Sequence, residues 1–93
     1  MKYILEFEDE SLKQIDEICT TLDSFKAAGG ADFLLELSEV VLLLEKFPLM
    51  GQEIEGYIRR IVMTKSKYNV YYKVNQATNE MRVLSIVYGP RVG

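Results

Sequence analysis

Histidine is absent from this chain of 93 residues, and cysteine occurs once. Without histidine the chain has no imidazole general base, no histidine-containing catalytic triad and no route to most kinds of zinc site. Cys19 has no second cysteine with which to form an intramolecular disulfide, which is typical of proteins of the reducing cytoplasm. We therefore expect a cytoplasmic protein without a metal or cofactor, in which any chemistry relies on Arg, Lys, Tyr or carboxylate side chains.

Long apolar runs are missing as well. The richest stretch, Val40 to Leu44, spans five residues, whereas a membrane-spanning helix needs roughly 20. This stretch is expected in the core, and no membrane contact is expected. The sequence contains no signal-peptide pattern, internal repeat, low-complexity segment or linker. Residues 1–93 are therefore expected to form a single domain.

Positive charge is scarce in the first part of the chain and concentrated in the last. Residues 1–55 carry four Lys and thirteen Asp or Glu, a net charge of −9, whereas residues 56–93 carry seven Lys or Arg and one Glu, a net charge of +6. Such clustering raises the local potential and selects partners of opposite charge, although the total charge is only −3. The C-terminal part is therefore expected to hold the working surface.

A strand followed by a helical hairpin is predicted in the acidic part. Residues 2–7 alternate between apolar and polar side chains, which is typical of a half-buried strand. Apolar residues then recur every three or four positions in residues 12–25 and 33–44, which indicates two amphipathic helices. The predicted apolar faces consist of Leu12, Ile15, Ile18, Leu22 and Phe25 in the first helix, and of Phe33, Leu34, Leu37, Val40, Val41 and Leu44 in the second.

The ends of these helices have recognisable signals. Ser11 and Gln14 match a capping box at the start of the first helix. Gly29-Gly30 is expected to end that helix, because glycine tolerates the left-handed conformation. Pro48 cannot continue the second helix, since it lacks an amide hydrogen. The residues between Gly51 and Gly56 are predicted to be an acidic connector.

Three strands are predicted in the basic part, at residues 57–64, 68–74 and 81–88. Their short connections indicate an antiparallel meander. The fold class is therefore predicted as α+β: one strand, a helical hairpin and a three-stranded antiparallel meander, with the helices packed on one face of the sheet. The other face of the sheet is expected to be open and to carry the polar half of each strand.

The middle strand of the meander separates two sets of side chains. Val70 and Tyr72, together with Tyr68 and Val74, share one face, which is expected to pack on the helices. The other face carries Asn69, Tyr71 and Lys73.

Basic and aromatic residues of the meander are the candidate binding groups. The arginines and lysines, which include Arg59, Arg60, Lys73 and Arg91, could grip phosphate or carboxylate groups, or serve only as solubilising charge. Tyr3, Tyr68 and Tyr72 fall on the apolar side of their strands and are expected in the core, whereas the roles of Tyr71 and Tyr88 stay open. We expect Glu6, Glu8, Asp9 and Glu10 to form a solvated turn rather than a metal site, and Cys19 to be a small core residue.

The segments FPLMG, GYIRRIVMTKSKYNVYYKV and MRVLSIVYGPR resemble the RelE/ParE toxin superfamily, whose members are also called plasmid stabilisation proteins. The resemblance spans nearly the whole chain. The corresponding positions are Phe47-Pro48, Gly51, Arg59 or Arg60, Tyr68, Tyr72, Gly89 and Arg91.

The resemblance implies one of two activities. RelE-like members cut messenger RNA in the ribosome with basic residues and often a Tyr or His, whereas ParE-like members poison DNA gyrase and lack that set. Asn69 stands where RelE-like proteins usually have an arginine, and only two residues follow Arg91, so we expect the RelE-like C-terminal extension to be missing. Arg60 and Arg91 match an anion site and are the candidates for a catalytic role, which is otherwise unassigned.

The sequence therefore indicates the toxin of a type II toxin-antitoxin pair that acts by protein binding and is closer to ParE than to RelE. The expected partners are a cognate antitoxin and, as the cellular target, DNA gyrase. The alternatives are a ribosome-dependent messenger RNA endonuclease and a non-toxic homologue that binds only an antitoxin. The expected partner-binding residues are Arg59, Arg60, Asn69, Tyr71, Lys73, Tyr88 and Arg91.

Overall fold

The computed structural model describes residues 3–89 of the chain. Within them the chain forms two helices and five strands, in the order β1 (Ile4–Phe7), α1 (Asp9–Phe25), α2 (Gly29–Lys46), β2 (Gln52–Glu55), β3 (Ile58–Met63), β4 (Tyr68–Asn75) and β5 (Glu80–Tyr88). None of the described helices is both long enough and apolar enough to cross a membrane.

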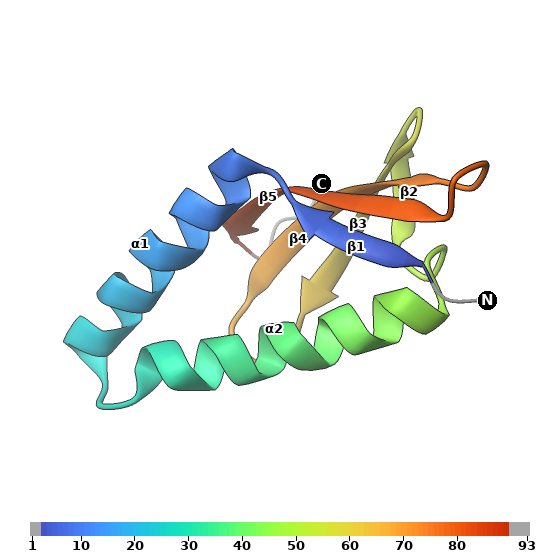
Figure 1. Cartoon of the computed structure of the whole chain (residues 1–93). Helices are drawn as coiled ribbons and strands as arrows, with labels where there is room; N and C mark the ends of the chain where they lie inside the picture. The colour runs from blue at the N-terminus through green and yellow to red at the C-terminus, as the bar shows by residue number, and fades with distance from the viewer. Residues whose placement is uncertain (1–2, 90–93) are drawn as a thin grey trace.

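The five strands form one mixed sheet in the order β1-β5-β4-β3-β2. Strand β1 runs parallel to β5, and the other neighbours are antiparallel. Both helices lie on the same side of this sheet, with α2 running beneath it and α1 rising from the hairpin turn toward β1 (Figure 1). The predicted α+β class, the meander of β3, β4 and β5 and the one-sided helical layer are thus confirmed.

The prediction of an acidic connector between Gly51 and Gly56 was wrong, because this segment contains strand β2. Gln52 lies opposite Arg60 and Glu53 lies opposite Arg59 in the register with β3. Gly56 adopts a left-handed backbone with φ 58° and so permits the tight turn between the two strands. The acidic edge strand therefore forms because a basic neighbour and a glycine turn lie directly after it in the sequence.

The predicted capping box was also wrong, because α1 begins at Asp9, before Ser11. Ser11 is buried, and its hydroxyl donates a hydrogen bond to the backbone oxygen of Glu8 at 2.7 Å. The side-chain oxygen of Gln14 instead accepts a hydrogen bond from the backbone N–H of Ile86 in β5, at 2.8 Å. Both residues therefore tie the start of the helix to its surroundings.

Gly29 and Gly30 begin α2, so the prediction that they end α1 was wrong. Ala28 adopts the left-handed conformation in this turn, with φ 64°. The glycines are needed because the two helices come very close together: a Cβ atom on Gly29 would lie 2.6 Å from the backbone oxygen of Leu22. The turn therefore selects glycine for space.

The core lies between the helices and the sheet, and the assignment of faces on β4 is confirmed. Tyr68, Val70 and Tyr72 are buried, Val74 packs against them, and Tyr3 and Cys19 border the same core as predicted. Three residues of the predicted apolar helix faces are solvent-exposed instead, because those helices extend past the sheet that covers their neighbours. They are Leu12 at 50 %, Phe25 at 81 % and Leu34 at 45 % exposure.

Candidate functional site

The side of the sheet away from the helices is the open face. Strand pairing arranges its side chains in rows across the sheet. The first row is Gln52, Arg60, Tyr71 and Ser85, the second is Ile58, Lys73, Arg82 and Glu6, and the third is Val62, Asn69 and Val87.

Arg60 and Tyr71 lie directly opposite each other at the centre of the open face. Both side chains are half-buried. One guanidinium nitrogen of Arg60, Nη2, donates a hydrogen bond to Gln52 Oε1 at 2.8 Å, while its Nε atom is buried and has no hydrogen-bond partner among the described residues. A cation and a phenol therefore stand side by side on this face, and the arginine retains a donor that is not used.

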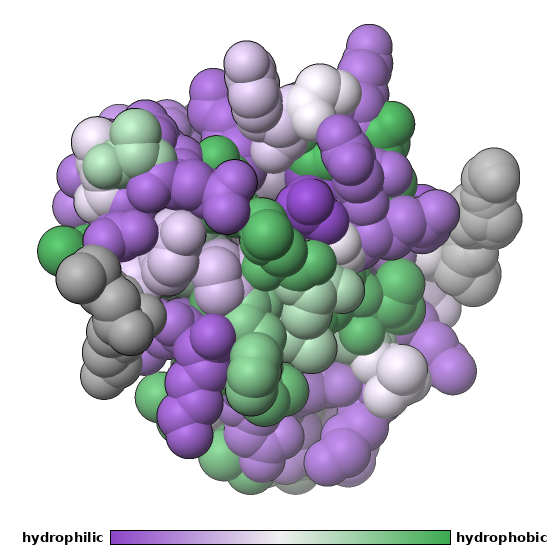
Figure 2. Space-filling view, turned by 90° about the vertical axis from the view of Figure 1, so that its right-hand side faces the viewer, coloured by the Kyte–Doolittle hydropathy of each residue, from purple (hydrophilic) through white to green (hydrophobic). Residues whose placement is uncertain are grey.

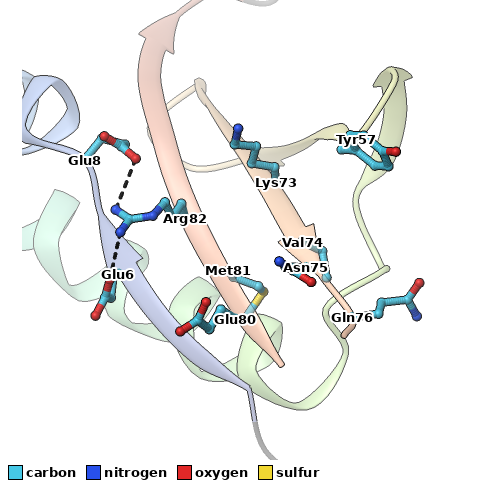
Figure 3. A pocket seen from close by; sticks show the side chains of 10 residues that line it. All are labelled: Glu6, Glu8, Tyr57, Lys73, Val74, Asn75, Gln76, Glu80, Met81 and Arg82. Atoms are coloured by element: carbon cyan, nitrogen blue, oxygen red, sulfur yellow. Dashed lines mark hydrogen bonds and ion pairs between the residues drawn. The ribbon is translucent and has the colours of Figure 1, made fainter. Parts of the chain in front are cut away.

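A cavity of about 630 Å³ lies at one end of the open face (Figure 3). On one wall, Arg82 binds two carboxylates: its Nη2 atom lies 3.3 Å from Glu6 Oε1 and its Nη1 atom lies 3.1 Å from Glu8 Oε2. The ring of Tyr57, on the turn between β2 and β3, stands on the opposite side, and Lys73 projects from β4 between them (Figure 3).

The two cations of this cavity differ in what they can bind. Arg82 is neutralised by Glu6 and Glu8, whereas the ammonium group of Lys73 has no hydrogen bond or ion pair within residues 3–89. Lys73 is exposed, and Tyr57 is 81 % exposed. The cavity can therefore accept an anionic group at Lys73 and an apolar or planar group against Tyr57.

Three other predicted binding residues serve the fold in this structure. Asn69 is buried, and its amide nitrogen donates hydrogen bonds to the backbone oxygens of Gly89 at 2.6 Å and Val87 at 3.4 Å, which fixes the end of β5. Arg59 faces the helical side, and Tyr88 packs edge-to-face on Tyr68 with ring centroids 5.2 Å apart. Arg91 lies outside the described residues.

The residues that carry the family resemblance meet at the loop of residues 47–51. Arg59 Nη1 donates hydrogen bonds to the backbone oxygens of Gly51 at 2.8 Å and Leu49 at 3.2 Å. The hydroxyl of Tyr72 donates to Pro48 O and accepts from the Gly51 N–H, both at 2.9 Å. A Cβ atom at Gly51 would lie 2.5 Å from that hydroxyl oxygen. These residues therefore act together as a clasp that holds the loop.

The clasp perturbs Tyr72 and displays apolar side chains. Burial raises the pKa of the Tyr72 hydroxyl, against the lowering effects of the Gly51 N–H and the Arg59 charge. Phe47, Leu49 and Met50 in the same loop remain 57 %, 44 % and 47 % exposed. Figure 2 shows one face of the molecule on which hydrophobic side chains gather in the middle of a hydrophilic surround.

Sequence reasoning missed the contributions of Gln52, Tyr57 and the Glu6–Glu8–Arg82 cluster. Arg82 is separated from Glu8 by 74 positions, so only the parallel pairing of β1 with β5 brings them together. The exposed aromatic of the Gly56-Tyr57 pair was the one local signal, because a glycine followed by a ring at a turn presents that ring to solvent.

The sequence matches no known family profile, and no curated protein matches it by sequence. Solved structures do match. The isolated RelE toxin of E. coli superposes with a TM-score of 0.68 at 17 % identity, covering 97 % of this chain and 87 % of that one. The RelBE2 toxin-antitoxin complex of Mycobacterium tuberculosis gives a TM-score of 0.73 at 12 % identity, covering 96 % and 100 %. The chromosomal ParDE toxin-antitoxin system of P. aeruginosa gives 0.65 at 12 % identity, covering 94 % and 96 %.

These matches extend over nearly the whole chain and include both branches that the sequence motifs suggested. They agree with the observed order of one strand, a helical hairpin and a meander, and with the clasp built from the motif residues. The chain therefore has the fold shared by the RelE and ParE toxins.

Proposed function

We propose that this chain is the toxin of a type II toxin-antitoxin pair and acts by binding proteins in the cytoplasm. The observation that carries the proposal is the similarity, over nearly the full length, to RelE and ParE toxins, two of which come from toxin-antitoxin systems. The proposed partners are a cognate antitoxin and, on the ParE-like reading, DNA gyrase.

The open face supports binding of a partner rather than a buried reaction centre. Lys73 offers an unpaired ammonium beside the ring of Tyr57 in a cavity of about 630 Å³, and Arg60 and Tyr71 continue the surface along the sheet. An antitoxin segment with carboxylate side chains would find complementary charge here and backbone groups along the edge strands. Coupled ordering of a disordered antitoxin tail fits such an extended surface.

The ParE-like reading is favoured by what the polar residues of the open face already do. Cleavage of RNA requires a base for the 2′-hydroxyl, an acid for the leaving oxygen and charge around the phosphate. The Asn69 amide is committed to backbone oxygens of residues 87 and 89, and Arg82 is committed to Glu6 and Glu8. Arg60 and Lys73 can hold an anion, which serves protein recognition equally well.

One observation favours the endonuclease as a second candidate. Arg60 and Tyr71 are cross-strand neighbours, and Lys73 follows on the same face, so a phosphate could contact two cations and a phenol. Purified protein incubated with translating ribosomes distinguishes the two. We expect the messenger RNA to remain intact, while codon-specific cuts that disappear in the Arg91→Ala and Arg60→Ala variants would establish the nuclease.

The toxin assignment is tested in cells. We expect expression of the chain alone to stall replication with gyrase-dependent DNA damage, and co-expression of a small protein encoded beside its gene to restore growth and to co-purify with it. If the neighbouring protein neither binds nor restores growth in the native host, the pairing is wrong. Binding without any effect of the chain on growth would identify a non-toxic antitoxin-binding homologue.

A further inference from the structure

The outward side of α2 carries an apolar stripe with no partner in the described structure. Leu35 and Leu42 are each 62 % exposed. They lie about two helical turns apart and point away from Leu37 and Leu44, which are buried on the opposite side. Scattered exposed leucines are ordinary, whereas leucines aligned on one helix face form a surface that favours contact with another molecule.

The spacing of this stripe is that of a helix-packing seam. Ala31, Leu35, Ser38 and Leu42 are all exposed and follow one another at steps of four, three and four residues, the a and d spacing of coiled coils. The two small residues allow the backbone of a partner helix to approach closely. The Ser38 hydroxyl already donates to the backbone oxygen of Leu35 at 2.7 Å, so covering it breaks no bond to water that lacks a replacement. These four residues are the α2 stripe.

Acidic side chains flank the α2 stripe. Asp32 and Glu39 each follow one of its small residues, at positions where charge selects the partner in coiled coils. The Glu39 carboxylate forms no ion pair or hydrogen bond within residues 3–89. Asp32 has only a solvent-exposed pair with Lys26, at 3.3 Å, which a partner can replace at little cost. The flank therefore favours a partner with lysine or arginine beside its apolar residues.

A hollow of about 440 Å³ borders the α2 stripe. Leu35 and Glu39 form part of its wall, and Phe25 at the end of α1 contributes a ring that is 81 % exposed. An apolar side chain of a helix lying on the stripe can enter this hollow between α2 and the end of α1, which adds contact area that a flat surface lacks.

We propose that the α2 stripe is a docking surface for an amphipathic helix of another protein, with leucine-like residues at its a and d positions and basic residues beside them. A second copy of this chain fits less well, because its own stripe is flanked by the same carboxylates. The surface lies on the helical layer, away from the open face. The inference therefore holds whether or not the chain is a toxin.

The test uses two synthetic peptides of about three heptads, both with leucine at a and d, one with lysine and the other with glutamate at the flanking positions. Fluorescence anisotropy with the full chain measures their affinities. We expect the lysine peptide to bind at least about tenfold more tightly than the glutamate peptide, with a preference that weakens at high salt. Equal affinity of the two peptides would refute the proposed role of the acidic flank.

Matched variants separate the stripe from general attraction to an acidic protein. Leu35→Gln/Leu42→Gln keeps every charge and should lose binding of the lysine peptide about tenfold or more, whereas Leu12→Gln, an exposed leucine of α1, should leave it unchanged. Glu39→Lys should weaken the lysine peptide and strengthen the glutamate peptide, a reversal that misfolding cannot produce. Binding that survives the double substitution overturns the proposal, as does a dimer in sedimentation velocity that the double substitution abolishes.

Discussion

At the scale of single residues, the motif positions of this chain are explained by one loop. Tyr72 and Arg59, on adjacent strands, both bind backbone atoms of residues 48–51, and Gly51 leaves room for the tyrosine hydroxyl. A side chain that satisfies two buried backbone groups contributes more than an average hydrogen bond, because its removal strands both of them. The sequence resemblance to toxins therefore reflects a structural requirement as well as a possible binding role.

The clasp makes a direct prediction. Tyr72→Phe removes only the hydroxyl, leaving Pro48 O and the Gly51 N–H without that partner, and should lower the free energy of unfolding by about 1–3 kcal/mol. Tyr71→Phe, on the open face of the same strand, is the matched control and should change it by less than about 0.5 kcal/mol. Urea denaturation of the three proteins measures both effects, and equal losses in the two variants would contradict the role of the clasp.

Alkaline pH should weaken the fold through the buried tyrosines. Burial raises the pKa of Tyr72 and of Tyr68 above the ordinary value of 10.0. The folded state then holds these protons more tightly than the unfolded chain does. The corresponding stabilisation is complete below the unfolded pKa and is lost as the pH rises through the folded pKa. Unfolding measured from pH 8 upward should show stability falling above about pH 10, and a shallower fall in Tyr72→Phe.

At the scale of elements, close approach determines the helical hairpin. The start of α2 packs against the end of α1 so tightly that only glycine fits at position 29, while Ala28 takes the left-handed conformation. The hydrogen bond from the Gly30 N–H to Asp23 Oδ1, at 2.8 Å, satisfies a free amide at the start of α2. The turn is therefore fixed by contacts between the helices.

Substitutions in this turn should have opposite effects. Gly29→Ala forces the helices apart and should cost about 1–3 kcal/mol of stability. Ala28→Gly relieves the left-handed strain and should add about 0.5–1 kcal/mol. Thermal melts of the two variants give the signs. If Gly29→Ala proves neutral, the close approach of the helices is not as described.

The packing of the helices on the sheet is tested by a second set of substitutions. Leu37 on α2 and Val70 on β4 are both buried. Leu37→Ala should destabilise by about 2–4 kcal/mol, and Val70→Ala by somewhat less because fewer methyl groups are lost. Lys73→Ala, on the open face beside Val70, should be nearly silent in thermal melts. A larger loss at Lys73 than at Val70 would reverse the assignment of the two faces.

At the scale of the whole molecule, the two halves of opposite charge become two layers. The acidic segment supplies both helices and both edge strands, and the basic segment supplies the three central strands. The open face therefore displays Arg60 and Lys73, while the outer helix surface displays carboxylates such as Glu39. Partners of opposite charge can then be directed to opposite sides of one small domain.

This arrangement predicts different responses to charge changes on the two layers. If the open face binds the antitoxin, Lys73→Glu should weaken that complex about tenfold or more, and the salt dependence of its association should fall. Lys26→Glu, an equal charge change on the helical hairpin, is the control and should leave the complex intact. Isothermal titration with the co-purifying partner measures both, and an equal loss in both variants would show that only total charge matters.

The helices, the meander and the core side of β4 could be predicted from the sequence alone, because periodicity reports directly which side chains of an element are buried. The family resemblance was available for a related reason, since Pro48, Gly51 and Tyr72 are local signals of one loop. Long-range pairing decided the rest. The edge strand β2 depends on its neighbour β3, and the Arg82 cluster depends on the parallel contact between β1 and β5. Likewise Asn69 looked like a binding group because its polar side chain falls on the open face, and only the three-dimensional position of residues 87 and 89 shows that its amide is already bound. Sequence period determines which side of an element faces the core, whereas the partners of a polar side chain are set by residues that are distant in the chain and meet only in the folded protein.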